Sequence, residues 1–300
     1  MTTTAKILLF GKGGQVGWEL QRSLAPLGEV VAVDFDSTDL CGDFTNPAGL
    51  AETVRLVKPT IIVNAAAHTA VDKAESEPEL ARTINAIAPG IIAQEAQRLG
   101  SWMVHYSTDY VFDGSGERAW TESDQPAPLS VYGQTKWEGE QLVATNCRKH
   151  LILRTSWVYA ARGGNFAKTM LRLSKERDSL NVIDDQIGAP TGADLLADIT
   201  ALALRQVQTQ PDLAGLYHLV ASGYTSWHGY ASLVIEQARQ AGIALKTPQN
   251  AIHKIATEAY PTPARRPINS KLDTSKIQTA FQVHLPSWQQ GVTRMLAEII

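Results

Sequence analysis

A tyrosine and a lysine stand four residues apart in the segment Tyr132-Gly133-Gln134-Thr135-Lys136. In a helix the two side chains share one face, because residues four apart are neighbours on a helix surface. A free phenol has a pKa of about 10, so a nearby cation must favour the phenolate before the hydroxyl exchanges protons readily near neutral pH. The pair therefore predicts proton-transfer chemistry, although a surface lysine lying over an aromatic ring has the same spacing.

Hydroxyl groups end an apolar run upstream of this pair, in Tyr106-Ser107-Thr108-Asp109. The Thr108 hydroxyl could hydrogen-bond the same oxygen that Tyr132 protonates. Two such donors would stabilise a carbonyl oxygen that becomes an alkoxide. Together the two segments predict an active site for reduction of a carbonyl, with Tyr132, Lys136 and Thr108 as catalytic residues.

A glycine-rich loop lies near the start of the chain, between an expected strand at 6–10 and an expected helix. Small residues let the backbone turn sharply and approach a diphosphate, whose charge the N–H groups of the helix N-terminus can meet. An ordinary glycine turn is the alternative, but strand, loop and helix have the order that a dinucleotide site needs. The residues of this loop predicted to bind the cofactor are Gly11, Gly13, Gly14, Gln15, Val16 and Gly17.

Further cofactor residues are expected at the ends of the next two strands. Asp34 could accept hydrogen bonds from the adenine ribose, which favours NADH, while Lys12 could offset a 2′-phosphate, so NADPH stays possible. Asp43 and Phe44 offer an acceptor and an aromatic face that suit adenine. Small side chains at 65–67 would let the cofactor lie against the backbone, and tight packing explains them equally well; these residues are Ala65, Ala66 and Ala67.

Short β-branched runs alternate with amphipathic stretches over the first half of the chain. Strands are expected at 6–10, 30–33, 61–64, 102–107 and 151–154, and helices at 16–27, 50–56, 80–99 and 132–143. This order predicts an α/β fold with a Rossmann-type, doubly wound parallel sheet. In such a sheet ligands bind beyond the carboxyl ends of the strands, where all the motifs above fall.

The regular alternation of strands and helices ends at about residue 159. A helix is expected at 165–177, and a turn at Gly188-Ala189-Pro190 and a proline-rich stretch at 261–267 follow. We expect a dinucleotide-binding domain over 1–160, rejoined by part of 193–220. The remainder of 161–300 is expected to form mainly a smaller C-terminal substrate-binding lobe.

Composition narrows the classes of partner. The chain has 300 residues and a formal net charge of -3, too small a charge to act on a polyanion over distance, so nucleic acid is not expected. The first apolar run, 7–10, is far short of a signal peptide or a membrane span, so we expect a cytoplasmic protein with no membrane partner. Cys41 and Cys147 have no neighbouring ligands at metal spacing and are expected to be plain thiols.

Five segments resemble the extended short-chain dehydrogenase/reductase family, and the similarity covers nearly the whole chain. They lie at 11–20, 64–72, 107–114, 153–159 and 185–191, the last reading Asp185-Gln186-Ile187-Gly188-Ala189-Pro190-Thr191. The resemblance is to the branch that reduces the C4 ketone of dTDP-4-dehydro-L-rhamnose to dTDP-L-rhamnose, a precursor of cell-surface polysaccharides. It implies a dTDP-sugar substrate and a hydride from NADH or NADPH.

The resemblance also implies roles for single residues. Tyr132 would donate the proton, Lys136 would tune it and hold the nicotinamide ribose, and Thr108 would steady the oxygen. Thr69 would join the cofactor residues. The residues expected to contact the substrate are Thr108, Asp109, Trp157, Asn165 and Arg266, of which Asn165 could equally be a helix N-cap and Trp157 a core residue.

Some members of the family are homodimers bridged by a divalent cation, and a similar site, with Mg²⁺, would fall here on Glu19, Asp194 and Glu298. Asp194 stands where a glutamate is expected, so its reach is shorter. Three separated acids form no motif by themselves, and a solvated surface is the alternative.

Two other functions compete with a reductase: another nucleotide-sugar epimerase or dehydratase of the same fold, and a non-catalytic, cofactor-binding regulatory subunit. Dehydratases that resemble this fold carry an Asp-Glu pair directly after the threonine. Here the segment is Thr108-Asp109-Tyr110. Because elimination of water needs an acid and a base besides the redox tyrosine, we expect reduction without dehydration.

Overall fold

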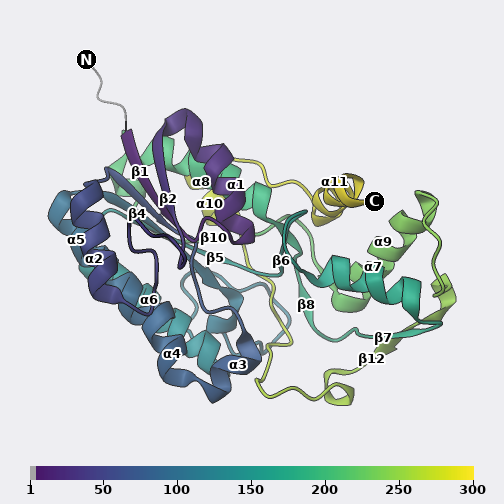
Figure 1. Ribbon diagram of the computed structural model, residues 1–300. Coiled ribbons are helices and arrows are strands. Elements are labelled where there is room, and N and C mark those ends of the chain that lie inside the picture. Colours follow the sequence, from purple (N-terminus) through teal and green to yellow (C-terminus); the bar gives the residue numbers. More distant parts are fainter. Residues whose placement is uncertain (1–4) are drawn as a thin grey trace.

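A six-stranded parallel sheet forms the centre of the larger part of the molecule (Figure 1). In this computed structural model, which describes residues 5–300, the strand order is β10-β5-β4-β3-β1-β2. The strands are β1 (Ala5–Phe10), β2 (Gly28–Val33), β3 (Ile61–Asn64), β4 (Trp102–Thr108), β5 (His150–Thr155) and β10 (Gly215–His218). The Rossmann-type doubly wound sheet is therefore confirmed, and the strand order reverses between β1 and β3, where such sheets bind their ligands.

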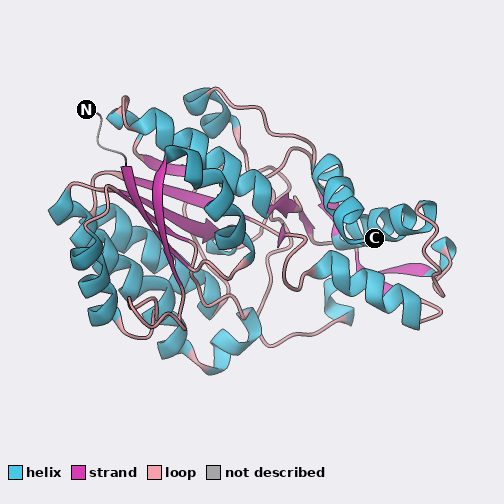
Figure 2. Ribbon diagram, turned by 45° about the horizontal axis from the view of Figure 1, so that its top comes forward, coloured by secondary structure: helices cyan, strands magenta, loops and turns pink. Residues whose placement is uncertain are grey.

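Helices cover both faces of this sheet, so the strands are buried on both sides (Figure 2). In β1, Ile7 and Leu9 point to one layer and Leu8 and Phe10 to the other, as the two-residue period of a strand requires. One layer contains α1 (Gln15–Leu24), α8 (Ala193–Val207) and α10 (Ser275–Phe281), and the other contains α2 (Pro47–Val57), α5 (Ala88–Leu99) and α6 (Val131–Asn146).

The expected helix at 80–99 is divided in the structure. It comprises α4 (Pro78–Arg82), a π-helical turn (Thr83–Ile87) and α5. Pro89 has no N–H to donate to the carbonyl of Asn85, four residues earlier. The helix widens in the turn before it, where the Ala88 N–H donates to the carbonyl of Thr83, five residues earlier. A short helix, α3 (Val71–Ser76), precedes this segment.

A smaller lobe extends from the carboxyl edge of the sheet and has its own apolar core (Figure 1). Its helices are α7 (Phe166–Glu176), α9 (Trp227–Gln240) and α11 (Trp288–Ile299), and β7 (Leu180–Ile183) pairs with β12 (Ile252–Ile255). Two-residue strands connect the lobe to the sheet: β6 (Val158–Tyr159) with β9 (Thr191–Gly192), and β8 (Ile187–Gly188) with β11 (Thr225–Ser226). Short 3₁₀ turns lie at Ala25–Leu27, Asp109–Val111, Pro211–Leu213, Gln249–Ala251 and Thr257–Ala259.

The segment 193–220 supplies α8 and β10 to the sheet part of the molecule, where β10 pairs with β5. Helix α10 packs there as well, because Ile277 and Phe281 lie in the same core as α8. This second return was not among the expectations from the sequence. None of the helices in the described residues combines the length and apolarity needed to cross a bilayer.

A buried ion pair ties α6 to β5. Glu140 accepts two hydrogen bonds from Arg154, at 2.8 and 2.6 Å, and both side chains are almost fully buried. We predict that Glu140→Gln costs about 3 kcal/mol or more of the free energy of unfolding, because a buried guanidinium loses its counter-charge. Urea unfolding measures the change.

Glu138→Gln on the same helix is the matched control, since its pair with Arg82 is partly exposed. It should cost less than about 1 kcal/mol. Equal costs for the two variants would show that the buried pair does not anchor α6.

Candidate active site

Helix α6 brings the predicted tyrosine and lysine to the end of β4. The helix starts at a Ser130 N-cap, whose hydroxyl accepts a hydrogen bond from the Gly133 N–H at 3.2 Å. A methyl group on Gly133 would overlap the carbonyl oxygen of Tyr110, so this glycine lets α6 approach the segment after β4. Tyr132, Lys136 and Thr108 line one cavity, which we call the catalytic cavity.

The electrostatics of the pair differ from expectation. We expected Lys136 to lower the pKa of Tyr132, but burial raises it to about 12, against a hydrogen bond with Thr108. The Lys136 ammonium instead donates to the Tyr106 carbonyl at 2.5 Å, and burial lowers its pKa to about 8. Tyr132 therefore stays a protonated phenol at neutral pH, which is the form that a proton donor needs.

The residues after Thr108 form the polar wall of the same cavity. The Thr108 hydroxyl donates to Asp109 Oδ1 at 3.1 Å and accepts the Tyr110 N–H at 3.2 Å. Burial raises the pKa of Asp109 to about 6. The Tyr110 ring packs edge-on against Tyr132, with centroids 5.4 Å apart, and burial raises the pKa of Tyr110 as well.

The glycine loop borders the other end of this cavity, whose volume is about 870 Å³. Gly11 has φ +82°, and a Cβ there would lie 2.8 Å from the Ala66 nitrogen, so only glycine lets the two chain segments meet. Asp34 turns into the loop: Oδ2 accepts the Gly13 N–H at 2.6 Å and Oδ1 the Phe35 N–H at 2.8 Å. The predicted cofactor residues lining the cavity are Gly11, Gly13, Gly14, Gln15, Val16, Asp34, Asp43, Phe44, Ala65, Ala66, Ala67, Thr69, Tyr132 and Lys136.

Gly17 is the exception among the predicted cofactor residues. It does not line the cavity in the described part of the chain, and a methyl group there would overlap the Gly11 carbonyl. Its small size shapes the loop and does not provide a ligand contact.

Several polar groups in this cavity fit a dinucleotide. No described side chain caps the N-terminus of α1, so its first N–H groups could meet a diphosphate. Ser107 Oγ, Asp109 Oδ2 and Thr155 Oγ1 are buried and have no hydrogen-bond partner among residues 5–300. Ser107 and Thr155 were not singled out from the sequence, although each lies at the carboxyl end of a strand.

A second cavity, of about 770 Å³, lies in the smaller lobe and adjoins the first, because the two share wall residues; we call it the lobe cavity. Tyr110 and Trp227 line both cavities. Arg266, which was predicted to contact the substrate, lines the lobe cavity, and Asp72 accepts two hydrogen bonds from its guanidinium at 2.8 and 3.1 Å. The lobe cavity therefore offers an oriented cation near the end of the catalytic cavity.

Of the other predicted substrate residues, Trp157 lines a cavity and Asn165 does not. Trp157 lines the catalytic cavity and stacks on Trp227, with ring centroids 3.6 Å apart. Asn165 lines neither cavity: its Oδ1 accepts the Lys168 N–H at the start of α7, and its Nδ2 donates to the Ala160 carbonyl. The N-cap alternative for Asn165 thus describes its place in the fold. Trp227 and Gln186 had no predicted role, because only tertiary structure brings them to a cavity.

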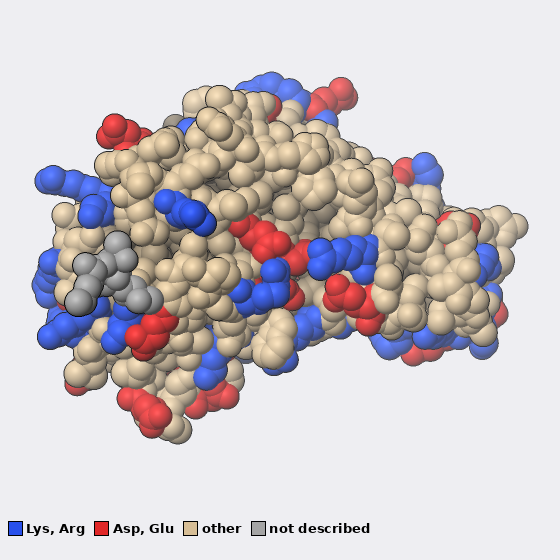
Figure 3. Space-filling model, turned by 90° about the horizontal axis from the view of Figure 1, so that it is seen from above, with Lys and Arg blue, Asp and Glu red and all other residues tan. Residues whose placement is uncertain are grey.

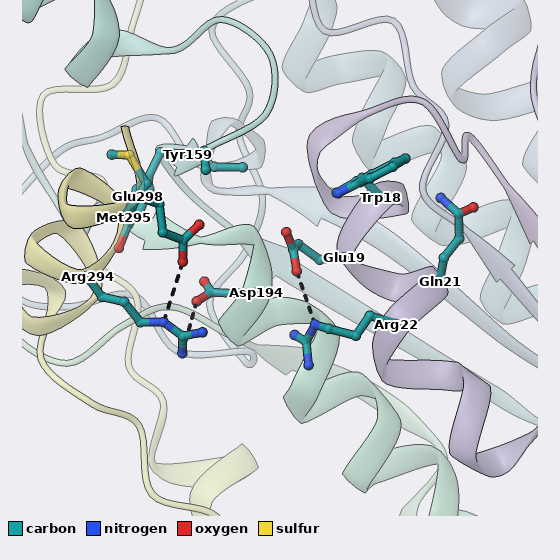
Figure 4. A pocket seen from close by; sticks show the side chains of 11 residues that line it. Trp18, Glu19, Gln21, Arg22, Tyr159, Asp194, Arg294, Met295 and Glu298 are labelled. Carbon is teal, nitrogen blue, oxygen red and sulfur yellow. Dashed lines mark hydrogen bonds and ion pairs between the residues drawn. The ribbon is translucent and has the colours of Figure 1, made fainter. Parts of the chain in front are cut away.

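The three acids expected to hold a metal line a separate pocket (Figure 4). Arg294 lies 3.8 Å from both Asp194 and Glu298, and Arg22 lies 3.4 Å from Glu19. Within residues 5–300, no group of three His, Cys, Asp or Glu side chains is placed to hold a metal ion. The acids of one chain are therefore not arranged to bind a cation by themselves, and a cation shared with a second chain stays a prediction of the resemblance.

On the face shown in Figure 3, acidic and basic side chains are interspersed.

The chain is similar to known proteins in both sequence and structure. Residues 5–300 match the family model described as RmlD substrate binding domain. A dTDP-4-dehydrorhamnose reductase of Escherichia coli (strain K12) is 64% identical over 293 residues, which cover 98% of this chain and 97% of the relative. A solved dTDP-4-dehydrorhamnose reductase from Clostridium acetobutylicum has a TM-score of 0.88 and 36% identity, covering 98% of this chain and 99% of its own. One from Bacillus anthracis, in complex with NADP, has a TM-score of 0.87 and 33% identity, covering 99% and 100%.

Asp109 should make the stability of the protein depend on pH. Its pKa is raised from 3.8 to about 6 in the folded protein. The stability that the neutral carboxyl contributes is therefore fully present below the unfolded pKa and is lost as pH rises through about 6. We predict that Asp109→Asn stabilises the protein by roughly 2 kcal/mol at about pH 8 and has little effect at about pH 4. Urea unfolding at the two pH values measures this difference, with the exposed Asp212→Asn as control. A gain that is the same at both values would show that Asp109 does not titrate as described.

Proposed function

The chain belongs to the dTDP-4-dehydrorhamnose reductase family of NAD(P)H-dependent oxidoreductases, and we propose that it reduces the C4 ketone of dTDP-4-dehydro-L-rhamnose to give dTDP-L-rhamnose. The observation that carries this proposal is the pair of adjoining cavities. One is lined by Thr108, Tyr132 and Lys136, and the other by Arg266. A sugar linked to a nucleotide diphosphate needs such a divided site, with its ketone at the proton donor and its nucleotide in the lobe.

The cofactor, when bound, supplies the hydride. We propose that the diphosphate of NADH or NADPH meets the N-terminus of α1 and that Asp34 accepts from the adenine ribose. Asp43 and Phe44 border the expected adenine end of the same cavity. Lys136, at the opposite end beside Tyr132, is the residue that would reach the nicotinamide ribose.

The chain's own residues supply the proton. As C4 gains the hydride, negative charge develops on its oxygen. The Thr108 hydroxyl turns its single hydrogen from Asp109 Oδ1 to that oxygen, and the Tyr132 hydroxyl transfers its proton to it. A phenol with a pKa raised to about 12 gives up its proton readily only to a strong base, which an alkoxide is. The buried Lys136 ammonium then offsets the charge left on Tyr132 until solvent reprotonates it.

Asp109 and Trp157 are proposed to contact the sugar. Asp109 Oδ2 is a buried acceptor in the cavity wall, where a sugar hydroxyl would satisfy it. Trp157 offers an apolar ring at the same end of the cavity. The two residues recognise different sides of a 6-deoxy sugar, one through a hydroxyl and the other through carbon-bound hydrogens.

We predict that Tyr132→Phe retains cofactor affinity and lowers turnover by about two orders of magnitude or more, because a positioned proton donor contributes roughly that much. Fluorescence titration with NADH measures the affinity, and oxidation of NADH with dTDP-4-dehydrorhamnose measures turnover. Turnover close to that of the unaltered protein would remove Tyr132 from the mechanism.

The substrate pair distinguishes a reductase from a dehydratase. Where related dehydratases carry a glutamate, this chain has Tyr110, a buried phenol whose raised pKa makes it a poor base at neutral pH. We predict that dTDP-glucose with NAD yields no 4-keto-6-deoxy product, whereas dTDP-4-dehydrorhamnose is reduced with one cofactor oxidised per product. Chromatography of the nucleotide sugars follows both reactions. Formation of the keto sugar without reduction in the second reaction would overturn the assignment.

A further inference from the structure

The segment Asp185-Gln186-Ile187-Gly188-Ala189-Pro190-Thr191 has no role in the mechanism above, yet it joins the two cavities. Its middle residues form β8, which pairs with β11, the strand directly before Trp227. Its end enters β9, which pairs with β6, the strand directly after Trp157. This one segment therefore brings together two tryptophans that are far apart in sequence.

The two indole rings are stacked, with centroids 3.6 Å apart and planes inclined by 13°. A Cβ on Gly188 would lie 2.7 Å from the Trp157 ring, so the glycine lets that ring lie against the backbone. Trp157 has φ +49°, a conformation that residues other than glycine rarely adopt and that persists only where the surroundings hold it. The Thr191 N–H donates to the Trp157 carbonyl at 3.2 Å, and Gly188 and Trp227 pack against the Trp157 ring.

Trp227 is itself held from the side of the lobe cavity. Its Nε1–H donates to Gln186 Oε1 at 3.1 Å, and the Gln186 amide donates to Thr257 Oγ1 at 3.2 Å. Gln186 is 3% exposed. Gln186 and Thr257 line the lobe cavity, Trp157 lines the catalytic cavity, and Trp227 lines both. A continuous set of contacts thus runs from one cavity to the other.

We propose that Trp227 is a positioning residue that couples the cavities, so that a nucleotide bound against Gln186 and Trp227 in the lobe fixes the Trp157 ring against the sugar. This inference rests on the proposed function, because it places the nucleotide in the lobe and the reacting carbon beside Tyr132. Binding energy from the nucleotide, which does not react, would then orient the ketone for hydride transfer. The Trp157 ring would transmit this binding energy from the nucleotide to the sugar.

A spectroscopic test needs no turnover. Two stacked indoles couple their electronic transitions, so the protein should show a circular-dichroism couplet that Trp157→Phe and Trp227→Phe each abolish. Trp288→Phe, which removes another tryptophan of the lobe core, should retain it. Addition of dTDP should change the couplet of the unaltered protein and change it less in Gln186→Leu. Calorimetric binding of dTDP with an unchanged couplet would overturn the coupling.

Kinetics provide the second test. Trp227→Phe should lower kcat about tenfold or more while the Kd for NADH stays within about twofold, because the reacting atoms are misplaced and the cofactor site is intact. Gly188→Ala should have the same effect, since its methyl group meets the Trp157 ring. Gly164→Ala is the matched control, because a Cβ there meets no atom within 4 Å among residues 5–300 other than its own chain neighbours.

Unchanged kcat in both Trp227→Phe and Gly188→Ala would overturn the proposal and leave the stack as lobe packing. Should Trp227→Phe fail to fold, Gly188→Ala and Gln186→Leu test the same contacts. A protein that shows the dTDP-induced change in the couplet but reduces no 4-keto sugar would contradict the proposed function and support the coupling, so the two failures are distinguishable.

Discussion

Helix α6 lies so close to its neighbours that methyl groups at Gly133 and Gly139 would overlap the carbonyl oxygens of Tyr110 and Asn85. This close approach removes water from the Tyr132 phenol and the Lys136 ammonium, which is why burial dominates the pKa of each, raising that of the phenol and lowering that of the ammonium. Farther along the helix, the buried pair of Glu140 and Arg154 fixes α6 to β5. The chemistry of the site therefore depends on a backbone contact that only glycine permits.

The sequence indicated the sheet well because its signals are local. The strand expected at 61–64 agrees with β3 at both ends, and the glycine loop, Thr108 and the Tyr132/Lys136 pair all follow from residue type and spacing. The hydrogen-bond partner of Lys136 could not be predicted in this way. Spacing places its ammonium on the face of Tyr132, but the carbonyl of Tyr106 on the next strand accepts its hydrogen bond, and sequence spacing contains no information on that contact.

The lobe was harder to foresee for a related reason. Its connecting strands have only two residues each, too few to show a period, and their partners are distant in sequence. Trp227, the first residue of α9, consequently had no predicted role, although it lines both cavities. Asn165 had two consistent interpretations from sequence, and the geometry at the start of α7 corresponds to the N-cap.

The edge strand β10 is made by residues that come after α7 and before α9, so the sheet is completed only once part of the lobe has been synthesised. Helix α10 adds to the sheet layer later still. The lobe therefore cannot be exchanged between relatives as a single continuous cassette, because cutting it out would also remove an edge strand and a covering helix. A chimaera with altered sugar preference would have to be built from three separate inserts, one before α8, one between β10 and α10 and one after α10 that carries α11, with α8, β10 and α10 retained from the host.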